Sequence, residues 1–100
     1  MIQCVSTAKV DLAKLDAIKE AGEKIAACAR GEHGNISYDI VQCADDPAVL
    51  LITERWETME DFQAHVATAD QPGDAVYEFG QVFDPACLEK PSFHIGSVIV

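Results

Sequence analysis

Two kinds of apolar spacing alternate along this 100-residue chain, and their order limits the possible folds more than any other feature. Strand-like segments, rich in apolar and β-branched side chains, occupy residues 2–8, 36–43, 49–56 and 93–100. Apolar residues three or four apart predict helices over 12–29, 58–69 and, before Asp84-Pro85, 76–83. The order β-α-β-β-α-(α)-β predicts an α+β, ferredoxin-like split βαβ fold, with helices on one face of an antiparallel sheet.

The first predicted helix has a recognisable start, face and end. Asp11 is a suitable N-cap, and Gly31 fits the left-handed position that ends many helices. The apolar face predicted for this helix consists of Leu12, Leu15, Ile18, Gly22, Ile25 and Ala29. We expect this face to pack on the sheet.

The second predicted helix carries a histidine among apolar residues. Thr58 and Asp61 have the spacing of a capping box at its start, with Asp61 reaching back. The side chains expected to face the sheet are Phe62, His65, Val66 and Ala69. An imidazole in an apolar stripe makes His65 a candidate for chemistry.

The strand 49–56 has apolar side chains on both faces. Helices cover only one face of a ferredoxin-like sheet, so the second face needs another cover, and a copy of the same sheet is the simplest one. The sequence therefore predicts a homodimer, in which residues 1–100 form a single domain.

Negative charge is concentrated in the second half of the chain. The formal net charge is −10, and residues 57–89 contain eight Asp or Glu and no Lys or Arg. Such a surface repels phosphate groups, which argues against a nucleic-acid partner. No apolar run approaches the roughly 20 residues of a membrane span, and the first residues lack the apolar block of a secretory signal. We expect a soluble, cytoplasmic protein without a membrane partner.

The metal-binding and cofactor motifs of common enzymes are not found in the sequence. Four cysteines lie far apart (Cys4, Cys28, Cys43 and Cys87), and we expect them to be buried free thiols. The histidines show no metal-ligand spacing, and His33 and His94 are expected to face solvent. The chain has no serine-hydrolase elbow, phosphate loop or dinucleotide fingerprint. We therefore predict no metal site.

Four side chains interrupt the apolar pattern and can meet in the predicted fold: Tyr38, Glu54, Trp56 and His65. Glu54 and Trp56 share a strand face about 6.7 Å apart, and His65 lies over them if that face looks toward the helices. His65 is suited to act as a base near neutral pH, with Glu54 to orient it. Tyr38 can hold a substrate oxygen, and Trp56 offers an apolar wall for an aromatic ligand. A hydrogen-bonded core histidine, with Tyr38 and Trp56 as core anchors, is the structural alternative.

Three short motifs, taken together, resemble the antibiotic biosynthesis monooxygenase (ABM) family. They are Glu32-x-Gly34-Asn35-x-x-Tyr38, Glu54-x-Trp56 and Phe62-x-x-His65. The resemblance covers nearly the whole chain and implies a dimeric α+β barrel with a pocket in each subunit between sheet and helices. The chain departs from the family at His33, where many members have Pro, and after the helix histidine, where it has Thr68-Ala69-Asp70.

The resemblance implies a cofactor-independent monooxygenase that oxidises a hydroquinone or anthrone-like aromatic with O₂. On this reading His65, Glu54 and Tyr38 are catalytic, and Trp56, Asn35 and Phe62 bind substrate. Two other functions stay open: an isomerase of small hydroxy-ketones that uses the same His and Glu, and a ligand-binding barrel without catalysis.

Overall fold

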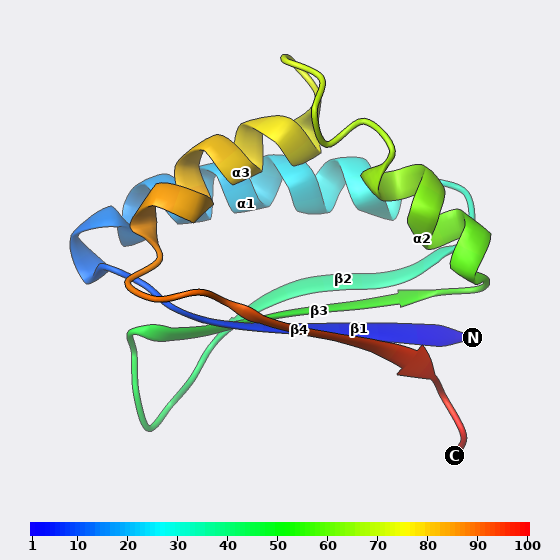
Figure 1. The fold of residues 1–100 in the computed structure, drawn as a ribbon, viewed down its shortest axis with the longest axis horizontal. Coiled ribbons are helices and arrows are strands. Elements are labelled where there is room, and N and C mark those ends of the chain that lie inside the picture. The colour runs from blue at the N-terminus through cyan, green and yellow to red at the C-terminus, as the bar shows by residue number, and fades with distance from the viewer.

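A computed structural model describes residues 1–100 as a four-stranded sheet with helices on one face (Figure 1). The strands are β1 (Ile2–Lys9), β2 (Asn35–Gln42), β3 (Val49–Trp56) and β4 (Ser92–Ser97). The helices are η1 (Leu12–Lys14, a 3-10 turn), α1 (Leu15–Arg30), α2 (Met59–Val66) and α3 (Ala75–Ala86).

The sheet order is β2-β3-β1-β4, and every neighbouring pair is antiparallel. This is the ferredoxin-like α+β arrangement that the element order predicts. Figure 1 shows α1 and α3 side by side over the sheet, and α2 over the end of the sheet where α1 leads into β2.

The core lies between the sheet and these helices, because alternate side chains of each strand point toward them. Along β3 the even-numbered residues are buried, and Leu50, Ile52 and Trp56 belong to the core. The helices contribute Ile18 and Ile25 from α1, and Phe79, Phe83 and Ala86 from α3, among others. The inward face of β3 therefore also fixes where Glu54 lies.

The first helix starts later than predicted. Asp11 is an N-cap as expected, but it caps the 3-10 turn, and its carboxylate accepts a hydrogen bond from the Ala13 N–H at 3.0 Å. The α-helix begins only at Leu15, and Leu12 is exposed. The tighter winding of the 3-10 turn rotates Leu12 away from the apolar face.

The glycine with left-handed backbone geometry is Gly34, and the prediction that it is Gly31 is wrong. Gly31 has a φ of −91° and continues the right-handed turn, whereas Gly34 has a φ of +79°. The backbone N–H of Glu32 still bonds to the Ala29 carbonyl, at 3.0 Å, so the chain keeps turning after α1 before it reverses. A Cβ at residue 34 would overlap the Asp61 side chain, and the close approach there requires glycine.

The second helix is shorter than predicted. Thr58 caps it as predicted, with its Oγ1 3.1 Å from the Asp61 backbone nitrogen, and the Asp61 carboxylate reaches back to Thr58 and accepts from its hydroxyl at 2.9 Å. Val66 is the last helical residue and is exposed, and Ala69 lies beyond the helix. Because the helix has only about two turns, its contact with the sheet ends at His65.

The third helix and the last strand also differ from the prediction. The helix continues through Pro85 to Ala86, and its end is held by a hydrogen bond from the Asp11 N–H to the Ala86 carbonyl, 2.9 Å. A proline in the last turn removes only one helical hydrogen bond, so the helix can continue through it. β4 ends at Ser97, so residues 98–100 do not extend it.

A β-bulge interrupts β2 at Ile36. Asn35 pairs with Trp56 and Ser37 with Arg55, so Ile36 is an extra residue and is 45 % exposed. In a regular strand Ile36 would share the face of Tyr38, two residues later, and the bulge prevents this. Because of the bulge, Asn35 has that position.

The sheet face that carries no helix holds partly exposed apolar residues, including Val41 and Leu51. This is the face for which the sequence predicts a second sheet as cover, and the homodimer stays a prediction. Separately, none of the helices combines the length and apolar character that crossing a membrane requires.

The four thiols are free, but they are not all buried as expected. Only Cys4 is fully buried, and burial raises the pKa of its thiol to about 12. Cys28 lies on an exposed position of α1, and Cys43 and Cys87 are intermediate.

Candidate active site

Four of the predicted site residues form one cluster between the sheet and α2. Tyr38 on β2 and Glu54 on β3 are partners in the antiparallel register, Trp56 follows Glu54 on the same face, and His65 lies above them on α2. Their exposed fractions are 3 %, 7 %, 0 % and 3 % in that order. The cluster therefore places three ionisable side chains, those of Tyr38, Glu54 and His65, in a nearly dry environment.

The His65 ring lies between two carboxylates. Its Nδ1 is 2.5 Å from Oε1 of Glu32, and its Nε2 is 3.9 Å from Oε1 of Glu54. Because a carboxylate only accepts hydrogen bonds, Nδ1 is the donor to Glu32. In the neutral ring, Nε2 then carries the lone pair and is available as a base.

Glu54 is held by the indole of Trp56. The Trp56 Nε1–H donates to Oε1 of Glu54 over 3.1 Å. Burial raises the pKa of Glu54, and the indole hydrogen bond and the nearby His65 oppose that rise. A buried carboxyl group needs a hydrogen-bond partner, and for Glu54 that partner is Trp56.

Aromatic rings enclose the imidazole. The ring centroids of Trp56 and His65 are 4.9 Å apart, and those of Tyr38 and His65 are 5.8 Å apart. Burial, and secondly the charge of Glu54, raise the pKa of Tyr38. Its hydroxyl therefore stays protonated and keeps its ability to donate a hydrogen bond.

Asn35 and Phe62 lie at the edge of this cluster. Asn35 pairs with Trp56 across the strands, but its side-chain amide donates to the Ser37 carbonyl at 3.2 Å. Phe62, one turn before His65, stacks on Phe93 of β4 with ring centroids 6.2 Å apart. Neither side chain has a hydrogen bond to the imidazole or its carboxylates.

Glu32 belongs to the site, although the sequence patterns do not predict a role for it. It lies in the turn after α1 and contacts a residue 33 positions later. The only signal in the sequence was its place in the first of the three motifs, because a turn glutamate beside Gly31 and Gly34 otherwise reads as a solvated residue. Its carboxylate is the short contact of the imidazole, a role assigned in the prediction to Glu54.

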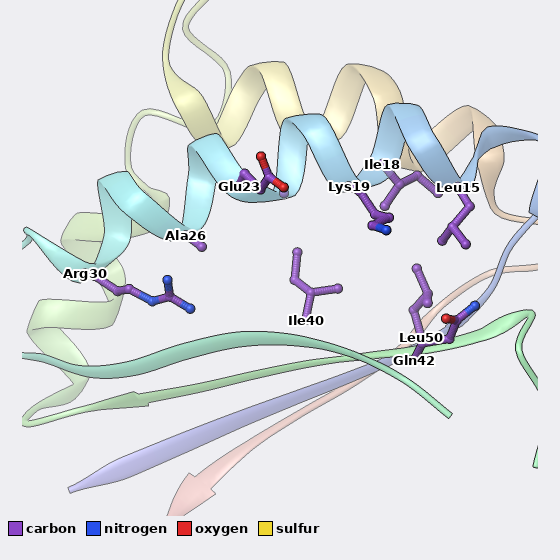
Figure 2. A pocket seen from close by; sticks show the side chains of 10 residues that line it. Leu15, Ile18, Lys19, Glu23, Ala26, Arg30, Ile40, Gln42 and Leu50 are labelled. Carbon is purple, nitrogen blue, oxygen red and sulfur yellow. The ribbon is translucent and has the colours of Figure 1, made fainter. Parts of the chain in front are cut away.

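A cavity of about 310 Å³ lies between α1 and the strands β2 and β3, and none of the four cluster side chains lines it. Figure 2 shows Ile40, Gln42 and Leu50 rising into it from the sheet, and Lys19, Glu23 and Arg30 reaching it from α1. Ile40, which lines the cavity, follows Tyr38 on the inward face of β2. The volume is at the lower end of typical ligand pockets.

Arg30 ties this cavity to the strand that carries Tyr38. Its guanidinium donates to the Tyr38 carbonyl at 2.7 Å and lies 3.4 Å from the Asp39 carboxylate.

No cluster of three or more His, Cys, Asp or Glu side chains is arranged to hold a metal ion.

Comparison with known proteins assigns the chain to a family. The model of the antibiotic biosynthesis monooxygenase family matches residues 1–72. No curated protein sequence matches the chain. Among solved structures, a putative antibiotic biosynthesis monooxygenase from Nitrosomonas europaea is 27 % identical, with a TM-score of 0.87 over 100 % of both chains.

Two further structures show the same fold at lower identity. A putative antibiotic biosynthesis monooxygenase from Caulobacter crescentus is 20 % identical, with a TM-score of 0.84 over 99 % of this chain and 90 % of its own. One from Deinococcus radiodurans is 19 % identical, with a TM-score of 0.82 over 98 % and 92 %. With a family match over most of its length and this fold, the chain belongs to the antibiotic biosynthesis monooxygenase family.

Proposed function

We propose that the chain is a cofactor-independent monooxygenase that oxidises a hydroquinone- or anthrone-like aromatic with O₂. Membership of the family supports this reaction class. The observation that carries the proposal is the buried imidazole of His65, whose Nδ1 is bound to Glu32 and whose Nε2 is free to take a proton. A base oriented by a carboxylate is what the first step requires.

The reaction needs little more than that base. Nε2 of His65 takes a proton from the substrate, and Glu32 stabilises the imidazolium that forms. The substrate anion passes one electron to O₂, and the resulting radical and superoxide combine into a carbon-bound peroxide. For an anthrone, the imidazolium returns its proton to the peroxide, and loss of water leaves a carbonyl, so that CH₂ and O₂ become C=O and H₂O.

The substrate is its own reductant in this scheme, and the protein contributes electrostatics and exclusion of water. In this proposal the Tyr38 hydroxyl, which stays protonated, donates a hydrogen bond that stabilises the substrate oxyanion. The cavity between α1 and the sheet, lined by Ile18, Ile40 and Leu50 among others, suits the apolar body of an aromatic substrate. We infer that the substrate lies there with its acidic end toward Tyr38.

We also infer that the protein acts as a homodimer in the cytoplasm. A second sheet would cover the partly exposed Val41 and Leu51 on the face without helices. Four free cysteines suit a reducing compartment.

The test is O₂ uptake by metal-stripped protein with a panel of hydroquinones, naphthols and anthrones. Wild-type protein should exceed the spontaneous rate with at least one compound, and His65→Ala should return the rate to the spontaneous one. Glu60→Gln, which changes an exposed carboxylate on α2, is the matched control and should keep the full rate. Uptake that is unchanged in His65→Ala would contradict the assignment of the base.

The isomerase alternative gives a different result in the same assay. Exchange of substrate protons with solvent, dependent on His65 but without O₂ consumption, would replace the monooxygenase by a proton-transfer enzyme. Binding of aromatics with neither reaction would favour a ligand-binding role.

A further inference from the structure

The turn after α1 contacts α2 through two neighbouring residues. Glu32 binds Nδ1 of His65 at 2.5 Å, and Nδ1 of His33 lies 2.9 Å from Oδ1 of Asp61. Asp61 and His65 are four residues apart, so they occupy successive turns of one face of α2. We call residues 31–34 the clamp turn, because two neighbouring side chains in it, Glu32 and His33, contact two successive turns of α2.

Two contacts constrain more than one does. The Glu32 side chain is 34 % exposed, so with this contact alone its carboxylate could leave Nδ1 for solvent. The second contact, about one helical turn away, holds the neighbouring residue of the turn on the same helix and opposes that movement. Its polarity is the reverse of the first: the turn supplies the histidine and the helix supplies the acid.

The helix side of the second contact is firmly held. The Asp61 side chain is 14 % exposed, and its Oδ2 accepts from the Thr58 hydroxyl at 2.9 Å. Gly34 lies directly against this side chain, where no Cβ fits. The Gly34 carbonyl also accepts from the Glu57 N–H at 2.8 Å, so the turn is hydrogen-bonded to the link between β3 and α2 as well.

We propose that His33 is a positioning residue, whose contact with Asp61 keeps Glu32 on Nδ1 of His65. The inference rests on the proposed function only in that His65 is taken as the base; the geometry it predicts can be measured without substrate. His33 itself is 90 % exposed and touches no part of the cluster, so it acts through Glu32.

The charged groups that face His33 are Asp61, at the start of α2, and Glu57, in the link from β3. Both are acidic. A protonated His33 is therefore attracted to the helix, and a neutral one keeps only the hydrogen bond to Asp61.

The test follows the Nδ1 proton of His65 by ¹H–¹⁵N NMR in protein without ligand. In wild type this proton should be protected from solvent exchange by the Glu32 carboxylate, and Glu32→Gln serves as the reference for a weakened contact. His33→Ala should reduce the protection by roughly tenfold, about the change in an equilibrium that the loss of one hydrogen bond causes. His33→Asn, whose amide nitrogen takes the position of Nδ1, should restore it.

Two further variants isolate the contact. Asp61→Ala removes the other partner together with its bond to the Thr58 hydroxyl, so it should lose at least as much protection, and adding His33→Ala to it should cause no further loss. Glu60→Ala, a neighbouring exposed carboxylate of the same helical turn, should leave the protection unchanged. Wild-type protection in His33→Ala, or losses that add in the double variant, would overturn the proposal.

The two proposals fail separately. If His33→Ala loses the protection but no compound gives His65-dependent O₂ uptake, the positioning role stands and the proposed reaction falls. If uptake depends on His65 but both the protection and kcat are unchanged in His33→Ala, the reaction stands and the positioning role falls.

Discussion

Nδ1 of His65 lies 2.5 Å from Oε1 of Glu32, a residue on the turn after α1 and 33 positions earlier in the chain. A contact this short between an imidazole and a carboxylate is a charge-assisted hydrogen bond that fixes both the tautomer and the orientation of the ring. Glu54 lies on the other side of the ring, at a distance that leaves Nε2 free. The two glutamates therefore have different tasks, and variants can separate them.

Glu32→Gln should slow O₂ uptake by roughly 10- to 100-fold in kcat, because a neutral amide does not stabilise the imidazolium. Uptake is measured with the best compound of the panel. Glu60→Gln makes the same chemical change at an exposed site and should have no effect. A wild-type kcat in Glu32→Gln would show that this carboxylate is not needed.

Glu54→Gln should raise the free energy of unfolding at neutral pH. Burial raises the pKa of Glu54, so the folded state binds this proton more tightly than the unfolded state, and stability falls as the pH rises from the unfolded toward the folded pKa. The Glu54→Gln variant has no carboxyl group to ionise at this position, so it does not lose stability over this pH range. Urea denaturation of both proteins at pH 4 and pH 7 measures it, and an equal pH dependence in the two would contradict the assignment.

Trp56→Phe should destabilise the protein by about 1–3 kcal/mol, since the buried Glu54 oxygen loses its indole donor. The same substitution in a Glu54→Gln background should cost less, because the amide is neutral and easier to bury unpaired. Chemical denaturation of the four proteins gives the coupling energy, and a value of zero would mean that the hydrogen bond contributes nothing.

Gly80→Ala should stabilise the protein by about 0.5–1 kcal/mol, and Gly22→Ala should gain less. A Cβ at residue 80 meets its nearest neighbour at 3.6 Å, whereas one at residue 22 meets Cδ1 of Ile40 at 2.9 Å, so the Ile40 side chain must move. The same Cβ narrows the cavity and should raise KM. Equal gains in thermal stability would show that Ile40 moves without cost.

The pair of His33 and Asp61 should make stability depend on pH at both ends of a window. Asp61 raises the pKa of His33, so the stabilisation from His33 is complete below its unfolded pKa and is lost as the pH rises through the folded one. His33 lowers the pKa of Asp61, so that contribution is lost as the pH falls through the depressed value. Melting temperatures of His33→Ala and wild type should converge outside this window and differ within it.

The fold and most of the site followed from sequence patterns, because they depend on local periodicity. Alternation along β3 put Glu54 and Trp56 on one face, and helical spacing put His65 on the inward face of α2. The element order then sufficed to bring these side chains together.

The features that sequence did not predict depend on tertiary contacts or on small changes of backbone geometry. The pairing of Glu32 with His65 joins a turn to a helix through space, and neither residue type announces it. The bulge at Ile36 carries no Gly or Pro to mark it, and the left-handed residue was Gly34, where Asp61 leaves no room for a side chain, and not Gly31.

The bulge at Ile36 makes the length of this segment matter as well as its composition. Asn35 and Tyr38 are three residues apart, and in a regular strand they would point to opposite faces; the extra residue brings both to the face of Trp56 and Glu54. Removing Ile36 would force either Asn35 away from that face or Glu32 away from His65. The number of residues between the clamp turn and Tyr38 on β2 therefore matters for the site as much as the identity of the residues that form it.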